Sequence, residues 1–466
     1  MSGKKKTPRF YAAMAEAKAL ISVMQRLGRN ATHVPGRKAL NMCPDFLDQI
    51  DKPEFMFGIT GTNGKTTVSN MIADVLQDNG YDLIDNRFGG NIDTGIVCSL
   101  VKNATAAGHL KKKLAVLEVD ERMTPKIFPY LKPDILVVTN LFRDSYRRNA
   151  HPRFIAGILN RSIPETSKLI LNAEDLMSNH LAPANKRVYF GIDCMKEDSE
   201  AGQNIINDMR SCPVCGNPME HEYIRYNHIG KAHCPKCGFG SPETNYGVTE
   251  IDRENDRMTI MTPKGEMNIK LPGHNITDAY NAVTAVAALS EFGLSNDAIA
   301  ASFEKLKIAK TRYDHNEVNG YAVECVVGKG QNPIACSRIF DYVRRQPGKK
   351  SVILIIDDFY DRKDSSENIA WFFDTDFEFL NDPDIEPIIV GGLRCHDIHL
   401  RLLMAGVPEE KIICCDSDTE TADHVQIEGK DAFYIVHDIY TTDYAYENRD
   451  KIIERIEKEG YHHEEN

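Results

Sequence analysis

A glycine-containing loop, Ile59-Thr-Gly-Thr-Asn-Gly-Lys-Thr-Thr67, stands between a predicted strand at 54–60 and a predicted helix at 68–77. In such a setting glycines let backbone N–H groups turn toward phosphates, and the N-terminus of the helix adds positive potential. Lys65 would reach the outer phosphates, and Thr66 would place its hydroxyl on Mg²⁺. Ile59 stands where the general pattern has its first glycine, so the loop is a variant of that pattern. The predicted ATP-binding residues of the loop are Gly61, Thr62, Asn63, Gly64, Lys65, Thr66 and Thr67.

Acidic residues close a second predicted strand, at 113–119, in the run Leu117-Glu-Val-Asp-Glu121. A carboxylate at such a strand end can hold the Mg²⁺ that bridges the β- and γ-phosphates. We choose Glu118 for this magnesium-binding, catalytic role. The alternative is that these acids only solvate the end of the strand.

Short β-branched runs alternate with helical stretches on both sides of the loop. This alternation predicts βαβ units on a parallel sheet, an α/β fold. Strands are expected at 54–60, 113–119, 134–139, 168–172 and 187–191, and a helical pattern spans 276–306. A second alternating region begins after about residue 310 and predicts a smaller α/β domain. We divide the chain into 1–45 (leader and helix), 46–308 (ATP-binding domain) and 309–466 (C-terminal domain).

Two Cys-x₂-Cys pairs lie in a polar module inserted at about 205–245. They are Cys212-Pro-Val-Cys215 and Cys234-Pro-Lys-Cys237, and a glycine follows each pair. Four thiolates at this spacing can fill a tetrahedral Zn²⁺ site and leave no open position, so we predict a structural zinc. Three histidines between the pairs are alternative ligands, although we interpret each as a solvated loop residue: His221, His228 and His233. The remaining eight cysteines are interpreted as small core residues.

The composition narrows the function. The 466 residues carry 56 Lys and Arg against 68 Asp and Glu, a net charge of −12, which argues against nucleic acid as a partner. Twelve cysteines are too sparse for a disulfide scaffold, and no apolar run is long enough to span a membrane. We therefore expect a cytoplasmic protein.

An ordered set of motifs along nearly the whole chain resembles the Mur ligase family, and within it the MurT-type branch. The set includes the phosphate loop, Asn86-Arg-Phe-Gly-Gly-Asn91, Thr139-Asn-Leu-Phe-Arg-Asp144 and the four-cysteine module. Gly392-Leu-Arg-Cys-His-Asp397 resembles the C-terminal domain of that branch. The resemblance implies a central phosphate-loop domain with an inserted zinc ribbon and a smaller Rossmann-like domain. It also implies that Asn275, in Leu271-Pro-Gly-His-Asn-Ile-Thr-Asp-Ala-Tyr-Asn281, lies near the nucleotide.

The resemblance further implies a reaction and a partner. In the branch, ATP activates the α-carboxylate of D-glutamate in the lipid II stem peptide, and ammonia converts it to D-isoglutamine. The ammonia comes from a GatD-like class I glutaminase subunit, and lipid II or a related precursor is met at the inner face of the membrane. An aspartate of the C-terminal domain is thought to complete the glutaminase's Cys–His pair. Asp358 matches it best here, with three rivals: Asp357, Asp361 and Asp364.

Two segments depart from the family pattern. An acidic run usually follows Asn-Leu-Phe-Arg-Asp, but here Ser145-Tyr-Arg-Arg-Asn-Ala-His151 places Arg147 at the acidic position. Gly328-Lys-Gly-Gln-Asn-Pro333 rearranges the family's Lys-Asn-Pro. Two other functions stay open: a Mur-type ligase that joins an amino acid to a different carboxylate, and a nucleotide-gated zinc-ribbon binding module.

Overall fold

The computed structural model describes residues 5–88, 90–144, 151–273, 275–306, 313–328, 332–356 and 369–459. Met1–Phe142, Pro152–Gly202 and Asp208–Lys307 form one compact unit, which we call unit 1. Arg143–His151, Gln203–Asn207 and Ile308–Asn466 form unit 2. The three predicted domains, with bounds at 45 and 308, stay a prediction.

Unit 1 is built on a nine-stranded sheet of order β11-β10-β9-β6-β5-β4-β1-β3-β2. Across the sheet from the edge strand β2 to β9, every pair of neighbouring strands is parallel. β10 and β11 then continue the sheet in antiparallel pairing. The strands are β1 (Phe55–Thr60), β2 (Leu83–Asp85), β3 (Leu114–Glu118), β4 (Ile135–Val138), β5 (Lys168–Asn172), β6 (Arg187–Ile192), β9 (Tyr246–Asp252), β10 (Arg257–Thr262) and β11 (Gly265–Lys270). The five strands predicted in this unit match β1, β3, β4, β5 and β6 within one residue at each end, because most of their residues are apolar and buried.

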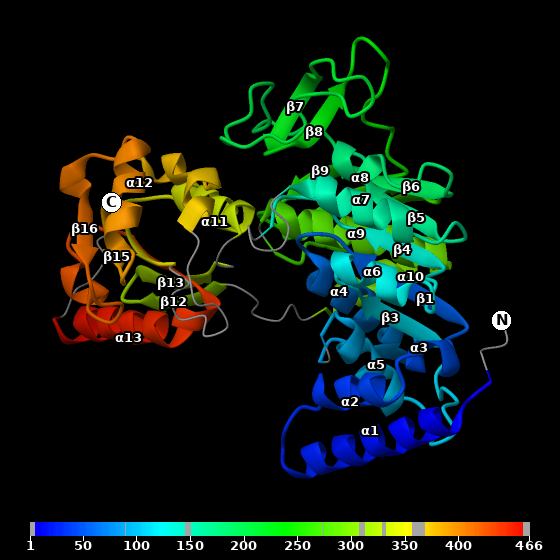
Figure 1. Ribbon diagram of the computed structural model, residues 1–466. Helices are drawn as coiled ribbons and strands as arrows, with labels where there is room; N and C mark the ends of the chain where they lie inside the picture. The colour runs from blue at the N-terminus through cyan, green and yellow to red at the C-terminus, as the bar shows by residue number, and fades with distance from the viewer. Residues whose placement is uncertain are drawn as a thin grey trace. The chain divides into compact units, whose positions relative to one another are not determined.

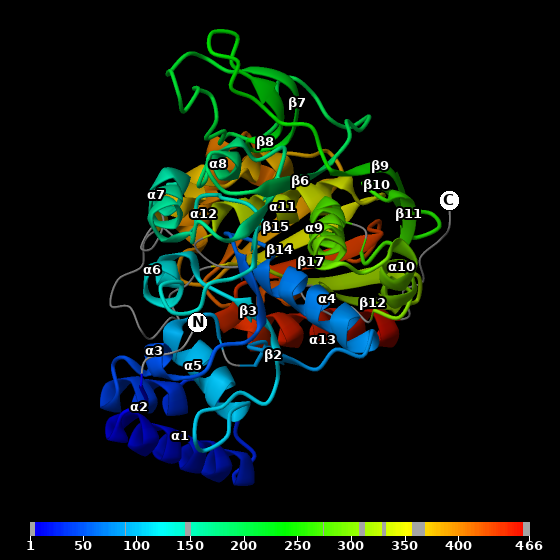
Figure 2. The same cartoon turned by 90° about the vertical axis from the view of Figure 1, so that its right-hand side faces the viewer.

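Helices cover both faces of this sheet. Figure 2 shows α4 (Lys65–Asp78), α9 (Ile276–Phe292) and α10 (Asn296–Phe303) on one side, and α5 (Asp93–Lys102), α6 (Thr124–Ile127) and α7 (Pro152–Ser162) on the other. The helix predicted at 276–306 is two helices, because Gly293 adopts φ +116° at the end of α9 and Ser295 caps α10. The remaining helices of unit 1 are α1 (Pro8–Arg26), α2 (Val34–Met42), α3 (Phe46–Gln49), α8 (Leu176–Asn179) and the short η1 (Glu121–Met123).

The cysteine module is inserted between β6 and β9. Its centre is an antiparallel hairpin of β7 (Glu220–Tyr226) and β8 (Ile229–His233). The hairpin stands at the end of unit 1 opposite to α1 and α2 (Figure 1). The chain leaves the sheet after β6, forms the module, and returns as β9, which pairs with β6 in parallel.

Unit 2 has a six-stranded sheet of order β12-β13-β17-β14-β15-β16, parallel except for the β12–β13 pair. Its strands are β12 (Tyr313–Val318), β13 (Tyr321–Val327), β14 (Lys350–Ile355), β15 (Ile385–Gly391), β16 (Ile412–Cys415) and β17 (Ala432–His437). One apolar cluster packs α11 (Pro333–Arg345) and α12 (Cys395–Met404) on the sheet, and a second packs α13 (Thr442–Lys458). Short 3-10 turns complete the described part: η2 (Ile369–Asp374), η3 (Phe377–Leu380), η4 (Glu409–Lys411), η5 (Thr421–His424) and η6 (Ile439–Thr441). This second α/β sheet agrees with the predicted fold class.

Among the described residues, no helix has both the length and the apolar character needed to cross a membrane.

Candidate active site and metal centre

The loop between β1 and α4 has a backbone that only glycine fits at two points. Gly61 and Gly64 adopt φ +124° and +84°, a conformation that other residues rarely take. A Cβ at Gly61 would lie 2.2 Å from Thr139 Oγ1, and one at Gly64 would lie 2.3 Å from Asn281 Oδ1. α4 begins at Lys65, so its free N–H groups lie at the loop. The loop therefore has the form of a phosphate cradle at the start of a helix.

The end of β4 holds this loop in shape. The Thr139 hydroxyl donates to the carbonyl oxygen of Asn63 at 2.7 Å. The amide of Asn140 both accepts from Asn63 N–H, at 3.0 Å, and donates to Asn63 O, at 3.1 Å. Because β1 and β4 are parallel neighbours, their carboxyl ends meet at one edge of the sheet, where ligands of such folds bind.

Lys65 lies inside the loop with its charge compensated. Its Nζ donates to Gly61 O, to Thr62 O at 3.2 Å and to Glu121 Oε1 at 3.2 Å. Burial alone would lower the pKa of Lys65, but the negative charges of Glu121 and Glu118 outweigh it and hold this pKa above its ordinary value. Lys65 is thus a cation at neutral pH. Burial raises the pKa of Glu121, whose surface is 4% exposed.

Glu118 lies directly beside Thr66. The Thr66 hydroxyl donates to Glu118 Oε2 at 2.8 Å, and Asn91 Nδ2 donates to Oε1 at 2.8 Å. Asn86 fixes the Glu118 backbone through both its N–H and its carbonyl. Hydroxyl and carboxylate oxygens are ligands that Mg²⁺ prefers, and octahedral coordination at about 2.1 Å spaces neighbouring ligand oxygens by about 3 Å. The two side chains therefore fit a magnesium site, and this role stays a prediction.

Sequence reasoning missed three residues at this site: Glu121, Asn91 and Asn281. All three lie in motifs already quoted, but only the fold shows that Glu121 pairs with Lys65, that Asn91 pairs with Glu118 and that Asn281 lies against Gly64. Asn275 is the N-cap residue of α9, and its N–H donates to Asp278 Oδ2 at 3.2 Å. Asn281, six residues further along, is the asparagine that lies against Gly64. A nucleotide contact by Asn275 stays a prediction.

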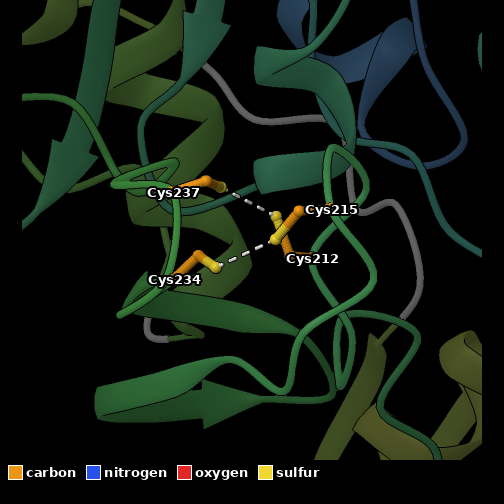
Figure 3. A group of neighbouring side chains, drawn as sticks. All are labelled: Cys212, Cys215, Cys234 and Cys237. Atoms are coloured by element: carbon orange, nitrogen blue, oxygen red, sulfur yellow. Dashed lines mark hydrogen bonds between the residues drawn. The ribbon is translucent and has the colours of Figure 1, made fainter.

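The four predicted zinc ligands come together in the inserted module. Their sulfurs all lie within 4.8 Å of one another, and Figure 3 shows the side chains pointing to a common centre. The Sγ atoms of Cys212 and Cys237 are 3.5 Å apart, as are those of Cys215 and Cys234. Tetrahedral zinc with Zn–S bonds of about 2.3 Å requires sulfurs about 3.8 Å apart, so the donor set fits the ion.

The two cysteine pairs have the same backbone geometry. Gly216 N–H donates to Cys212 O and Gly238 N–H donates to Cys234 O, each at 2.9 Å. Both glycines have positive φ, +73° and +74°. Such turns point backbone N–H groups at the sulfur. Burial opposes this effect at Cys234, but N–H groups of Cys237 and Lys236 lower its pKa to about 7. At Cys237 a hydrogen bond to the Phe239 backbone lowers the pKa, but burial and hydrogen bonds with the other three thiols outweigh it and raise this pKa.

The histidines of the module are not in this ligand group. His233 is exposed, as expected, but it is the last residue of strand β8 rather than a loop residue. His228 is fully buried, so its interpretation as a solvated loop residue is wrong: the β7–β8 hairpin folds onto the end of β5, placing His228 Nε2 3.3 Å from Asp175 Oδ1 and its ring against Phe142. His221 is half-buried. Among the other cysteines, Cys194 is exposed and Cys414 is half-buried, so the interpretation of all eight as core residues is also wrong.

Removal of one ribbon ligand gives a direct test of the zinc prediction. Cys212→Ser should lose one equivalent of zinc per chain, because three ligands and a hydroxyl hold this ion far more weakly than four thiolates. Elemental analysis of wild type and variant after gel filtration measures the loss. Cys194→Ser, which removes an exposed thiol outside the module, should keep the wild-type content. Wild-type protein without zinc would contradict the assignment.

Some predicted functional residues lie outside the described part of the chain. These are Asp358, its rivals Asp357, Asp361 and Asp364, and Arg147 of the altered segment. His151 is described and is exposed. The assignments of Asp358 and of the altered segment stay predictions.

A parallel sheet that carries this loop, with the Lys65–Glu121 and Thr66–Glu118 pairs beside it, defines a phosphate-loop α/β protein. Residues 59–215 match the model of the Mur ligase middle domain, and residues 330–442 match that of the MurT ligase C-terminal domain. The chain is 31% identical over 435 residues to the Staphylococcus aureus (strain COL) protein "Lipid II isoglutaminyl synthase (glutamine-hydrolyzing) subunit MurT", covering 90% of this chain and 94% of that protein. The chain belongs to the MurT family of Mur ligases.

Further comparisons agree with this membership. The protein of the same name from Streptococcus pneumoniae (strain ATCC BAA-255 / R6) is 29% identical over 87% of this chain and 88% of its own length. Among solved structures, a pseudomurein peptide ligase type C from Methanothermus fervidus matches with a TM-score of 0.63, at 20% identity, over 90% of this chain and 84% of that one. MurF from Acinetobacter baumannii also matches with a TM-score of 0.63, at 16% identity, over 90% and 80% of the two chains. These structural likenesses show the fold.

Proposed function

We propose that this chain is the ligase subunit of a lipid II isoglutaminyl synthase, which amidates the α-carboxylate of D-glutamate in the stem peptide. The observation that carries the proposal is the 31% identity to a protein of that name over 90% of this chain and 94% of that protein. Both units of the chain are covered, so the match is not confined to a shared ATP-binding domain. Lipid II, or a related precursor met at the inner face of the membrane, is the proposed substrate, and the cytoplasm is the proposed location.

The first chemical step transfers the γ-phosphoryl group of ATP to the substrate carboxylate, giving an acyl phosphate and ADP. Lys65 and the N–H groups at the start of α4 would bind the phosphates and stabilise the charge that spreads over the transferring group. Thr66 and Glu118 would hold Mg²⁺, which neutralises phosphate charge when bound. Glu121 and Asn91 would act as positioning residues, because they contact Lys65 and Glu118 rather than the reactants.

The second step is attack by ammonia on the acyl carbon. The new C–N bond forms, the C–O bond to phosphate breaks, and inorganic phosphate leaves with the electron pair while the nitrogen loses a proton. The name of the relatives includes glutamine hydrolysis, and we propose a GatD-like class I glutaminase subunit as the source of ammonia. Asp358 of this chain is our proposed partner for the imidazole of that subunit.

The deciding experiment is mass spectrometry of lipid II after incubation with this protein, ATP and Mg²⁺. One reaction contains ammonium chloride, and another contains glutamine with and without a co-encoded glutaminase. We expect the D-glutamate carboxylate to become a carboxamide with ammonium alone, and with glutamine only when the glutaminase is present. ATP hydrolysis without amidation would contradict the proposal and favour an amino acid as nucleophile on another carboxylate. No ATP turnover with any carboxylate would instead favour the nucleotide-gated binding module.

A further inference from the structure

A second group of side chains of the kinds that can bind a metal lies in unit 2, at the carboxyl ends of two neighbouring parallel strands. β15 ends at Gly391 and β16 ends at Cys415, in register with each other. Gly392 N–H donates to Cys415 O at 3.1 Å and ties the two strand ends together. α12 begins at Cys395, directly after this turn. The fold thus brings the residues after β15 against the last residues of β16.

Four side chains of different chemistry converge at this place. Cys395, His396 and Cys414 each offer a ligand atom, and these atoms lie within 4.8 Å of one another. Asp416 Oδ1 is 3.4 Å from Cys395 Sγ and 3.9 Å from His396 Nε2. Tetrahedral zinc, with Zn–S bonds of about 2.3 Å and Zn–N bonds of about 2.1 Å, spaces neighbouring donor atoms by about 3.5 to 3.8 Å. The 3.4 Å and 3.9 Å separations of Asp416 Oδ1 from Cys395 Sγ and His396 Nε2 already lie close to these spacings.

Packing alone does not account for the group. Cys395 is 1% exposed and is a reasonable core residue, but Cys414 is half-buried. The side chains of His396 and Asp416 are 79% and 89% exposed, so they add nothing to the apolar core. The arrangement of two sulfurs on the protein side and two polar ligands on the solvent side matches a metal site at the surface, with access for the ion.

We propose that Cys395, His396, Cys414 and Asp416 form a second zinc site, separate from the cysteine module and independent of the proposed function. Two soft thiolates and an imidazole favour Zn²⁺ over Mg²⁺ or Ca²⁺, and a carboxylate is a further ligand that Zn²⁺ accepts. Binding would release the two thiol protons and replace the Cys395–Asp416 hydrogen bond by two bonds to the metal. The ion would link the start of α12 to the end of β16. The four side chains would fill all four coordination positions of the ion, so the site would be structural.

The experiment is zinc analysis of the full-length protein, purified under reducing conditions and dialysed against buffer containing zinc and then against metal-free buffer. We expect two equivalents per chain in the wild type and one in Cys414→Ser. Cys415→Ser is the matched control, because the neighbouring residue of a strand points to the opposite face, and it should keep two equivalents. The ribbon variant Cys212→Ser should also keep one, and the double variant Cys212→Ser/Cys414→Ser none.

Cobalt substitution gives a readout that does not depend on counting. In the Cys212→Ser background only the proposed site remains, and Co²⁺ should give visible bands of tetrahedral geometry with thiolate charge transfer. His396→Ala should weaken Co²⁺ binding at least about tenfold, since loss of an outer-shell partner already costs that much. A Cys414→Ser protein that keeps both zinc equivalents would overturn the proposal. A Cys395–Cys414 disulfide in peptide maps of the reduced, zinc-loaded protein would overturn it as well.

Discussion

Lys65→Ala should abolish ATP turnover, with a loss of roughly a thousandfold, while the protein remains folded. The magnitude follows from the loss of a charged donor aimed at the transferring phosphoryl group, where removal of one such donor costs roughly 10²- to 10³-fold. Lys65 can act as this donor because it stays protonated: Glu121, 3.2 Å away, and the nearby Glu118 raise its pKa. The measurement is ATP consumption and product formation with lipid II, per folded molecule.

The fold should survive because the group left behind can discharge itself. Glu121 is buried and its pKa is already raised by burial. Without the Lys65 cation this pKa rises further, and the carboxyl group takes up a proton instead of remaining as a buried charge. The Lys65→Ala protein should therefore keep the circular dichroism spectrum of the wild type.

Lys52→Ala is a matched control for the loss of a lysine. The Lys52 amino group also donates to backbone carbonyls of unit 1, at Leu47, Asp48 and Ile50, but it lies outside the loop. We expect this variant to lose some stability and to keep the turnover of each folded molecule. Near-normal turnover by folded Lys65→Ala would overturn the assignment of the phosphate loop.

The parts of the fold that could be predicted are those with a strong local signal. β4 and β5 are continuous apolar runs because both faces of the parallel sheet are covered. β10 and β11 were not predicted, because they lie in the antiparallel part of the sheet, where buried and exposed residues alternate among many polar ones. The end of α9 at Gly293 had its signal in the sequence, a glycine followed by the capping residue Ser295, but the regular alanine spacing on both sides hid it.

The candidate site, like the fold, could be predicted only where the signal is local in the sequence. The glycines, Lys65 and the four ribbon cysteines are recognisable from spacing alone, because their chemistry needs neighbours in the sequence. Glu121 could not be assigned to Lys65, since the pairing depends on how the end of β3 meets the loop after β1. The burial of His228 could not be foreseen for the same reason. A polar hairpin residue becomes buried when the hairpin packs on another part of the sheet.

Arg225 is one of the residues that join the inserted module to the rest of unit 1. It lies on β7 with its side chain 4% exposed. Its guanidinium contacts Glu174 Oε1 at 2.5 Å and Asp198 Oδ2 at 2.7 Å, and it also donates to the hydroxyl of Tyr280 on α9. Glu174 follows β5, so three separate parts of the chain meet at one buried cation.

Arg225→Met should lower the free energy of unfolding of unit 1 by roughly 3 to 5 kcal/mol, because it leaves Glu174 and Asp198 buried without their cation. Urea unfolding, monitored by hydrogen exchange of the β7 and β8 amides, measures this loss in the free energy of unfolding. Lys231→Ala is the matched control on the same hairpin. Lys231 pairs with Glu222 at 3.2 Å, but both side chains are about half exposed to solvent, so its loss should cost less than about 1 kcal/mol. Equal losses in the two variants would contradict the role of Arg225.

The pH dependence separates loss of charge pairing from loss of packing. Burial raises the pKa of Glu174, and removal of the Arg225 cation raises it further. A carboxyl group with a raised pKa in the folded state favours folding at low pH, and this contribution disappears as the pH rises through that pKa. The deficit of Arg225→Met should therefore be larger at pH 8 than at pH 5. Adding Glu174→Gln should restore part of the stability at pH 8 and little at pH 5, whereas a packing defect would be the same at both pH values.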